Sequence, residues 1–271
     1  MKKLFILALA AGAMLVSCTG NQKKAETSEE TEKCFEQQQI EAYIKVQVDS
    51  LASEFSKMSR SPFIAALKEG RIELTEEEKQ VKPEYLIDPA SVNDLVTLSQ
   101  KYRAVSVLCA DKLIANAYGM PIDEYDAAIK KLIVDIDDPA FKLFQENDEK
   151  GVEQQKLIED FYNAEDKNGR INFFWDTTTA FLVEELYIIS QDPSNKFIEC
   201  FDDQAADNVT YRIILFQNAL ENLKAYDSSL ESLCTAIKPL NKLNAINAQQ
   251  FKEQIADMNK DIKVLRENLL K

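Results

Sequence analysis

The sequence predicts an all-α protein, and three observations lead to this fold class. The 271 residues include 6 glycines and 7 prolines, where average usage would supply roughly 33 of the two together. Apolar residues recur every three or four positions between these breaks, which is the spacing of one helix face. No segment alternates apolar and polar residues for long enough to predict a sheet. Long helices with few breaks are therefore expected.

Composition limits the classes of function that the chain can have. It carries 46 acidic and 32 basic side chains, and 45% of its residues are hydrophobic. The acidic balance argues against binding to nucleic acid. Because the chain has no histidine, Ser-His-Asp and Cys-His nucleophiles, histidine-ligated zinc and Glu-x-x-His di-iron sites are all excluded. No motif assigns a catalytic, cofactor-binding or metal-binding residue.

The N-terminus has the pattern of an export signal. Lys2 and Lys3 precede an apolar run from Leu4 to Leu15. This run is too short to cross a bilayer as a helix, which needs about 20 residues. A positive start followed by a short apolar core is typical of a cleaved signal peptide.

The end of this segment, Leu15-Val16-Ser17-Cys18, resembles the lipobox of bacterial lipoproteins. The resemblance covers about the first 20 residues. It implies removal of residues 1–17, diacylglyceryl transfer to the Cys18 thiol and acylation of the new amino terminus. Two or more acyl chains anchor a protein stably in a membrane. Thr19 follows the cysteine, where the Gram-negative sorting pattern for the inner membrane has Asp. The resemblance therefore implies an outer-membrane lipoprotein, on a face that the sequence leaves open.

Residues 18–33 read as a lipidated, flexible tether. Between Thr19 and Lys33 the one apolar side chain is Ala25, so the segment cannot bury enough surface to fold. As a coil it would reach ~20 Å. The remaining residues, 34–271, are predicted to form a single all-α domain.

Helical spacing predicts helices over 35–58, 90–118, 122–136, 151–165 and 171–191, with an irregular surface segment over 70–89. Asp precedes Pro at Asp88, Asp138 and Asp192. An Asp cap followed by a proline in the first turn predicts a helix start at each position.

The C-terminal third shows the most regular pattern. Apolar residues step by three and four alternately from Ala248 to Leu269, and a similar pattern runs from Val209 to Ile237 with a break at Asp227. We expect a long antiparallel hairpin, which completes an antiparallel bundle of about seven to nine helices. Its seams can be ordinary core or a surface left open for a partner helix, and core packing is favoured.

Three acidic segments are candidates for metal binding or catalysis. Asp166, Asn168 and Gly169 match the middle of an EF-hand loop, but Ala164 and Trp175 stand where the loop needs acidic ligands, so we predict a helix-linking turn. The other two segments are Asp135, Asp137 and Asp138, and Asp202, Asp203 and Asp207. Paired carboxylates can bind a hard cation or cleave glycosides, yet both groups flank predicted helix ends, which favours capping.

Two further features leave alternatives open. An aromatic helix carries Phe173, Phe174, Trp175, Phe181 and Tyr187, and it is either the central helix of the bundle or one wall of a ligand pocket. The cysteines that remain after lipidation are Cys34, Cys109, Cys200 and Cys234. Four cysteines allow three pairings, and none is assigned.

Beyond the lipobox, the chain resembles the small helical lipoproteins of Bacteroidota. The expected function is that of a non-enzymatic binding or scaffold protein, attached to the membrane through Cys18 and presenting a helical surface to an envelope protein partner. The alternatives are a carboxylate-dependent glycan-active hydrolase and a carrier of an apolar small molecule. The heptad seams permit a dimer without requiring one.

Overall fold

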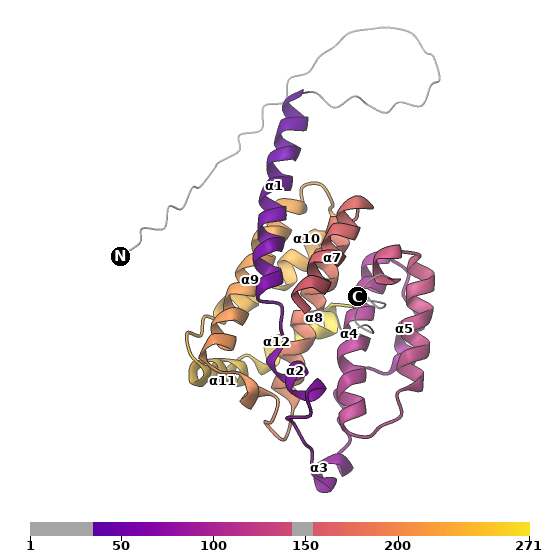
Figure 1. Cartoon of the computed structure of the whole chain (residues 1–271), viewed down its shortest axis with the longest axis vertical. Coiled ribbons are helices and arrows are strands. Elements are labelled where there is room, and N and C mark those ends of the chain that lie inside the picture. The colour runs from indigo at the N-terminus through magenta and orange to yellow at the C-terminus, as the bar shows by residue number, and fades with distance from the viewer. Residues whose placement is uncertain (1–34, 143–153) are drawn as a thin grey trace.

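The computed structural model describes residues 35–142 and 154–271 (Figure 1). The predicted signal peptide, Cys18 and the tether lie outside the described residues, as does Cys34. Within the described ranges the fold is all-α, as predicted, and contains no strand. The α-helices are α1 (Phe35–Lys57), α2 (Pro62–Lys68), α3 (Glu76–Gln80), α4 (Leu98–Ala117), α5 (Asp123–Ile136), α7 (Gln154–Lys167), α8 (Ile171–Gln191), α9 (Asp203–Leu223), α10 (Ser229–Ala236), α11 (Ala248–Asp257) and α12 (Asn259–Asn268). Three short 3-10 helices are η1 (Pro89–Asp94), η2 (Ile198–Cys200) and η3 (Lys238–Lys242).

Helix α8 is the centre of the bundle. It packs against α4, α7, α9 and α12, and Figure 1 shows these helices around it. Its single Trp175 has no exposed surface and is surrounded by the rings of Phe55, Phe174 and Phe216. The aromatic helix is therefore core, the interpretation that its spacing favoured.

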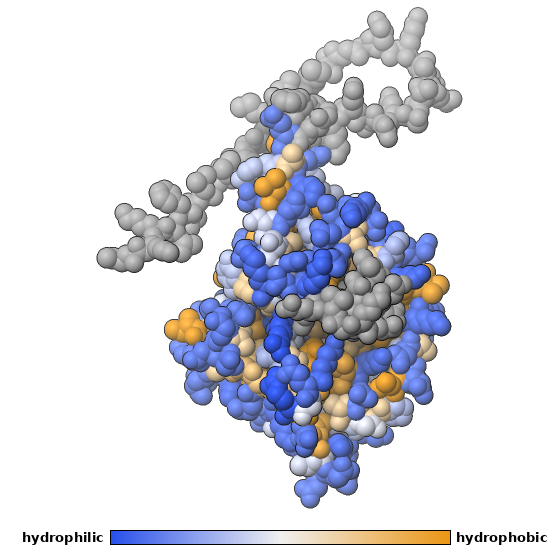
Figure 2. Space-filling view, in the orientation of Figure 1, coloured by the Kyte–Doolittle hydropathy of each residue, from blue (hydrophilic) through white to orange (hydrophobic). Residues whose placement is uncertain are grey.

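The other helices cover α8 in two groups. Helix α1 lies against α7 and α9, while α5 folds back on α4 after a short link. Figure 1 shows α1 extending beyond the body at one end of the longest axis, with α3 at the other end. The face in Figure 2 is mostly hydrophilic, with apolar side chains in small separate groups. In the described part of the chain, no helix is both long and apolar enough to cross a membrane.

Several predicted helices agree closely with the structure. The predictions for α1, α5 and α8 differ from the observed bounds by one residue or less, and α7 runs two residues past its predicted end. The helix predicted over 90–118 begins instead at Leu98. Its start is set by Thr97 and Gln100, which form a reciprocal capping box, while Asp88 caps the separate helix η1.

The other two Asp-Pro pairs differ from each other. The Asp138 carboxylate accepts the Ala140 N–H at 2.8 Å, and residues 139–142 are helical as predicted. Asp192 starts no α-helix, which corrects the prediction. Its carboxylate accepts the N–H groups of Ser194 and Phe197 and so closes a turn before η2.

The predicted long C-terminal hairpin is also corrected, because each arm is divided in two. The chain turns between α9 and α10, where the Asp227 carboxylate accepts the Ser229 N–H at 2.9 Å. It bends again at Met258, so that α11 lies on α9 while α12 lies on α8. Asn259 holds this bend by donating to the Ser190 carbonyl at 2.7 Å. The chain accordingly forms more and shorter helices than the seven to nine expected. The seam residues remain core, since the side chains of Phe251, Ile255, Met258, Ile262, Leu265 and Leu269 are buried.

Candidate functional site

An open cavity of about 480 Å³ lies between two segments of the chain, 83–89 and 120–125. The first segment leads from α3 into η1, and the second comprises the end of the link from α4 to α5 and the first turn of α5. Binding pockets for small organic molecules span roughly 300–1,000 Å³, so the cavity has a suitable size. The link between α4 and α5, whose residues line the cavity, lies near the end of the molecule that carries α3, opposite the first turn of α1 (Figure 1).

The walls of this cavity are mainly apolar and conformationally restricted. Leu86, Ile87, Met120 and Tyr125 contribute apolar surface. Three prolines also line it, Pro83, Pro89 and Pro121. Because a proline ring fixes φ near −65°, these segments lose little additional freedom when a ligand binds.

The backbone of Ile87 is held from two sides. Its N–H donates to the Asp111 carboxylate of α4 at 2.7 Å, and its carbonyl accepts the Tyr125 hydroxyl of α5 at 3.0 Å. Burial raises the pKa of Tyr125 to about 12, with a further contribution from the charge of Asp111. The hydroxyl therefore stays protonated as a donor at neutral pH. These two bonds fix the cavity wall to the bundle.

Behind this wall lies a buried polar group formed by α4, α8 and α12. Arg266 donates from Nε to Glu184 at 3.1 Å, its Nη2 lies 3.7 Å from Asp111, and its guanidinium lies over the Tyr187 ring. Burial, and then the neighbouring charge of Glu184, raise the pKa of Asp111 well above its usual range. Burial likewise raises the pKa of Glu184, against the opposing charge of Arg266. The group joins three helices and supports the wall from the inside.

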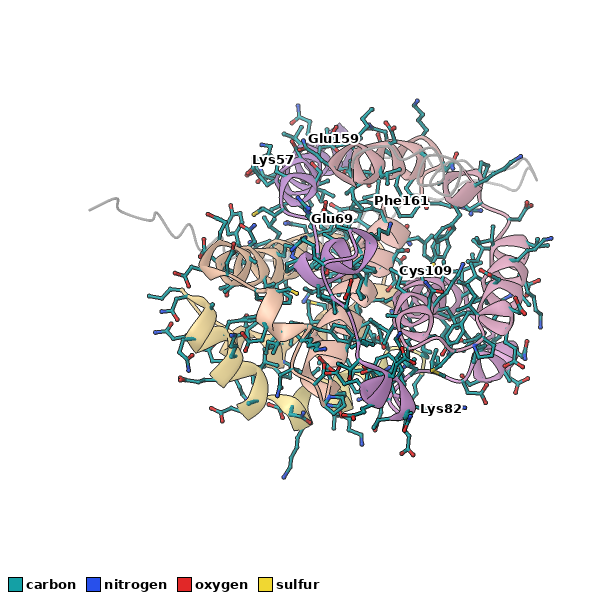
Figure 3. All side chains as sticks on the ribbon, turned by 60° about the horizontal axis from the view of Figure 1, so that its bottom comes forward. Lys57, Glu69, Lys82, Cys109, Glu159 and Phe161 are labelled. Carbon is teal, nitrogen blue, oxygen red and sulfur yellow. The ribbon has the colours of Figure 1, made fainter. Side chains whose placement is uncertain are left out.

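The rim of the cavity is acidic. Glu84, Asp88, Asp123 and Glu124 all line it, and all four are exposed. In the part of the chain that the structure describes, none of the residues that line it is Lys or Arg. Figure 3 shows the neighbouring Lys82 beside α3 at the edge of the molecule. Among the described residues, no ion pair involves any of these four carboxylates.

The sequence did not predict this site. Glu84 and Asp88 stand next to prolines in the segment 70–89, which was predicted to be irregular, whereas Asp123 and Glu124 fall in the helix predicted over 122–136. That these two segments face each other depends on how α4 and α5 pack, and residue spacing does not reveal that packing.

The acidic segments considered earlier have structural roles. Asp166 pairs with Lys45 at 2.9 Å, and Gly169 has a positive φ in the turn before α8, as predicted. Asp202 caps α9, and Asp203 accepts the Ala248 N–H at 2.8 Å. Asp135 lies 3.8 Å from Lys101. In the described ranges no three Cys, Asp or Glu side chains are placed to hold a metal ion.

A carboxyl pair does occur at Asp138, with Glu165 as a partner that the sequence did not suggest. Asp138 accepts hydrogen bonds from Tyr102, Arg170 and Asn168. Burial, and then the charge of Asp138, raise the pKa of Glu165 to about 9, whereas hydrogen bonding lowers the pKa of Asp138 despite its burial. Asp138 is 4% exposed and Glu165 is fully buried. The Asp138 carboxylate thus joins α4 to the turn before α8, beside the buried Glu165 of α7.

The sequence assigned no pairing of the cysteines, and Cys34 lies outside the described residues. Cys200 bonds to the Lys196 carbonyl and Cys234 to the Glu221 carboxylate. Both carry free thiols, and Cys109 is exposed on α4.

Comparison with protein-family models, with curated proteins and with solved structures finds no match to this chain. The function must therefore be argued from the residues themselves.

Proposed function

We propose that the chain is a non-enzymatic binding protein of the bacterial envelope, anchored to the outer membrane through lipid on Cys18, and that the acid-rimmed cavity is its binding site. The anchor and its location come from the lipobox pattern. The binding role is supported by a cavity of ligand size with preformed walls.

The position of the cavity carries this proposal. The tether joins the body at the first turn of α1, while the cavity lies near the end that carries α3 (Figure 1). Helix α1 alone is about 35 Å long at 1.5 Å per residue. Because the tethered end and the cavity lie at opposite ends of the body, attachment through Cys18 would leave the cavity accessible to a partner.

The anchor is tested by labelling cells with an alkyne fatty acid. The wild type is expected to carry label and to sediment with outer membranes. Cys18→Ala is expected to carry none and to leave the membrane fraction. Label on Cys18→Ala, or a membrane-bound unlabelled protein, would contradict the anchor.

The binding site is tested by photocrosslinking in intact cells. A benzoylphenylalanine replaces the exposed Pro121 at the cavity or, as a matched control, the exposed Val264 on α12. A discrete crosslinked species from position 121 and not from position 264 is expected, and mass spectrometry would identify it. Equal patterns from both positions would show that the cavity is not a binding site.

A further inference from the structure

The cavity combines two chemical requirements that few ligands satisfy together. Its floor offers apolar surface from Leu86, Ile87 and Met120, and the ring of Tyr125. Its rim carries four acidic side chains with no basic residue among the lining groups. Water-exposed carboxylates attract a cation, while the floor gains free energy by covering an apolar group.

Local structure accounts for three of the rim carboxylates but not for the fourth. Asp88 caps η1, and Asp123 and Glu124 lie in the first turn of α5, where negative charge favours the helix dipole. Glu84 lies outside any helix and has no hydrogen bond or ion pair among the described residues. Its exposed carboxylate is accessible to a ligand at the rim.

The arrangement also indicates the kind of cation. In the described ranges, no three acidic side chains are close enough to chelate one metal ion. The rim carboxylates therefore suit a ligand whose cationic group contacts a single carboxylate at a time. The rest of such a ligand would be apolar and would lie on the cavity floor. An ammonium on an alkyl chain has this form, because its chain packs on apolar surface while its charge stays near water.

We infer that the cavity binds an alkylammonium ligand, whose methylene chain lies on Leu86, Met120 and Tyr125 and whose ammonium group lies beside Glu84 and Glu124. This inference rests on the proposed binding function and specifies its ligand class. The same chemistry is found in a free alkyl diamine and in the lysine side chain of a protein partner. The experiment distinguishes these two sources.

Isothermal titration of the lipidated full chain in zwitterionic micelles tests the inference with four probes. They are 1,5-diaminopentane, acetyl-Leu-Lys-Leu-amide, the same peptide with an acetylated lysine, and acetyl-Leu-Glu-Leu-amide. Binding of either charged amine is expected, without binding of the last two. Diamine binding alone would identify a free amine as the ligand, and binding of the lysine peptide alone would identify a protein segment.

Substitutions at the rim test whether the amine binds in this cavity. Glu84→Gln combined with Glu124→Gln is expected to weaken amine binding about three- to tenfold, as the loss of two exposed charge contacts would. The matched control combines Glu231→Gln, from the first turn of α10, with the exposed Glu253→Gln, and it should bind like the wild type. Equal thermal unfolding of both double variants shows that folding is unaffected.

The outcomes separate this inference from the proposed function. Equal affinity for the lysine and acetyl-lysine peptides, or equal weakening in both double variants, would overturn the ligand class. If position 121 still crosslinks specifically in cells, the binding function stands with another ligand. If the amine does not bind and position 121 does not crosslink specifically, both the ligand class and the proposed binding function would be overturned.

Discussion

Arg103 of α4 and Asp176 of α8 form an ion pair of 2.6 Å whose two side chains are almost fully closed to solvent. These two residues are 73 positions apart in the sequence. Asp111 and Glu184, which lie further toward the C-terminal ends of the same two helices, are also 73 positions apart. The constant offset shows that α4 and α8 run in parallel. Arg266 of α12 enters between the second two residues.

Helix α8 thus carries buried carboxylates that different helices neutralise. Arg103 of α4 pairs with Asp176, Arg266 of α12 with Glu184, and Arg212 of α9 with Glu185 at 2.7 Å. Breaking a buried pair by removing one partner usually costs several kcal/mol, because the other charge stays buried.

Arg266→Met is therefore expected to lower the free energy of unfolding by about 3–5 kcal/mol. Urea denaturation measures this loss, with Lys263→Met on the exposed side of α12 as the control. A loss in Arg266→Met no greater than in Lys263→Met would mean that the arginine does not neutralise the buried carboxylates.

Glu165→Gln should change how stability depends on pH. The pKa of Glu165 is raised to about 9 from a usual value of 4.5, so the folded state binds a proton that the unfolded state has lost between these values. Stability then falls as pH rises through this interval, by up to about 1.4 kcal/mol per pH unit. The neighbouring Asp138 has a lowered pKa and remains ionised throughout.

Urea denaturation at several pH values between 5 and 9 measures this slope. Glu165→Gln should remove the part of the slope that Glu165 contributes, while Asp111 and Glu184, whose pKa values are also raised, keep the rest. Glu267→Gln on the exposed surface of α12 should retain the full slope of the wild type. Parallel curves for the wild type and Glu165→Gln would contradict the raised pKa.

Asp202→Ala should destabilise the protein by about 1 kcal/mol, because the Asp202 carboxylate caps α9 by accepting the Ala205 N–H at 2.8 Å. Asp207→Ala, further along the same helix and exposed, should have little effect. Thermal unfolding measures both, and added Ca²⁺ should leave the wild type unchanged. Equal losses, or a rise in melting temperature with Ca²⁺, would favour a cation role for this acidic segment.

Tyr125→Phe should loosen the cavity wall. The variant loses the hydrogen bond to the Ile87 carbonyl, which is worth about 1 kcal/mol, so amide hydrogens in residues 83–89 should exchange faster. Tyr226→Phe removes an exposed hydroxyl and serves as the control. Unchanged exchange in Tyr125→Phe would show that the wall is held by other contacts.

Much of the fold could be predicted from residue spacing, because α1 and α5 each bury a periodic apolar stripe and α8 is a long apolar helix that is buried on nearly all sides. The bend at Met258 could not, since the apolar steps continue through it without a Gly or Pro. The bend depends on the contact between Asn259 and Ser190, 69 positions apart. Interactions over such distances leave no mark in local spacing.

The buried ion pairs of α8 could not be predicted for the same reason. Asp176, Glu184 and Glu185 appear in the sequence as polar breaks in an apolar helix, and their partners lie 73, 82 and 27 positions away. The cavity likewise depends on two distant segments. By contrast, the capping role of Asp202 and the turn at Gly169 are local, and the sequence predicted both.

The buried ion pairs of α8 also determine when this helix can reach its native packing during synthesis of the chain. Glu184 is buried beside a cation that the chain provides at residue 266, so a nascent or truncated polypeptide that stops before α12 cannot balance that charge. Such a fragment would expose the apolar surface of α8 to proteases and chaperones. Native packing of α8 thus requires a residue that the ribosome adds 82 positions after Glu184.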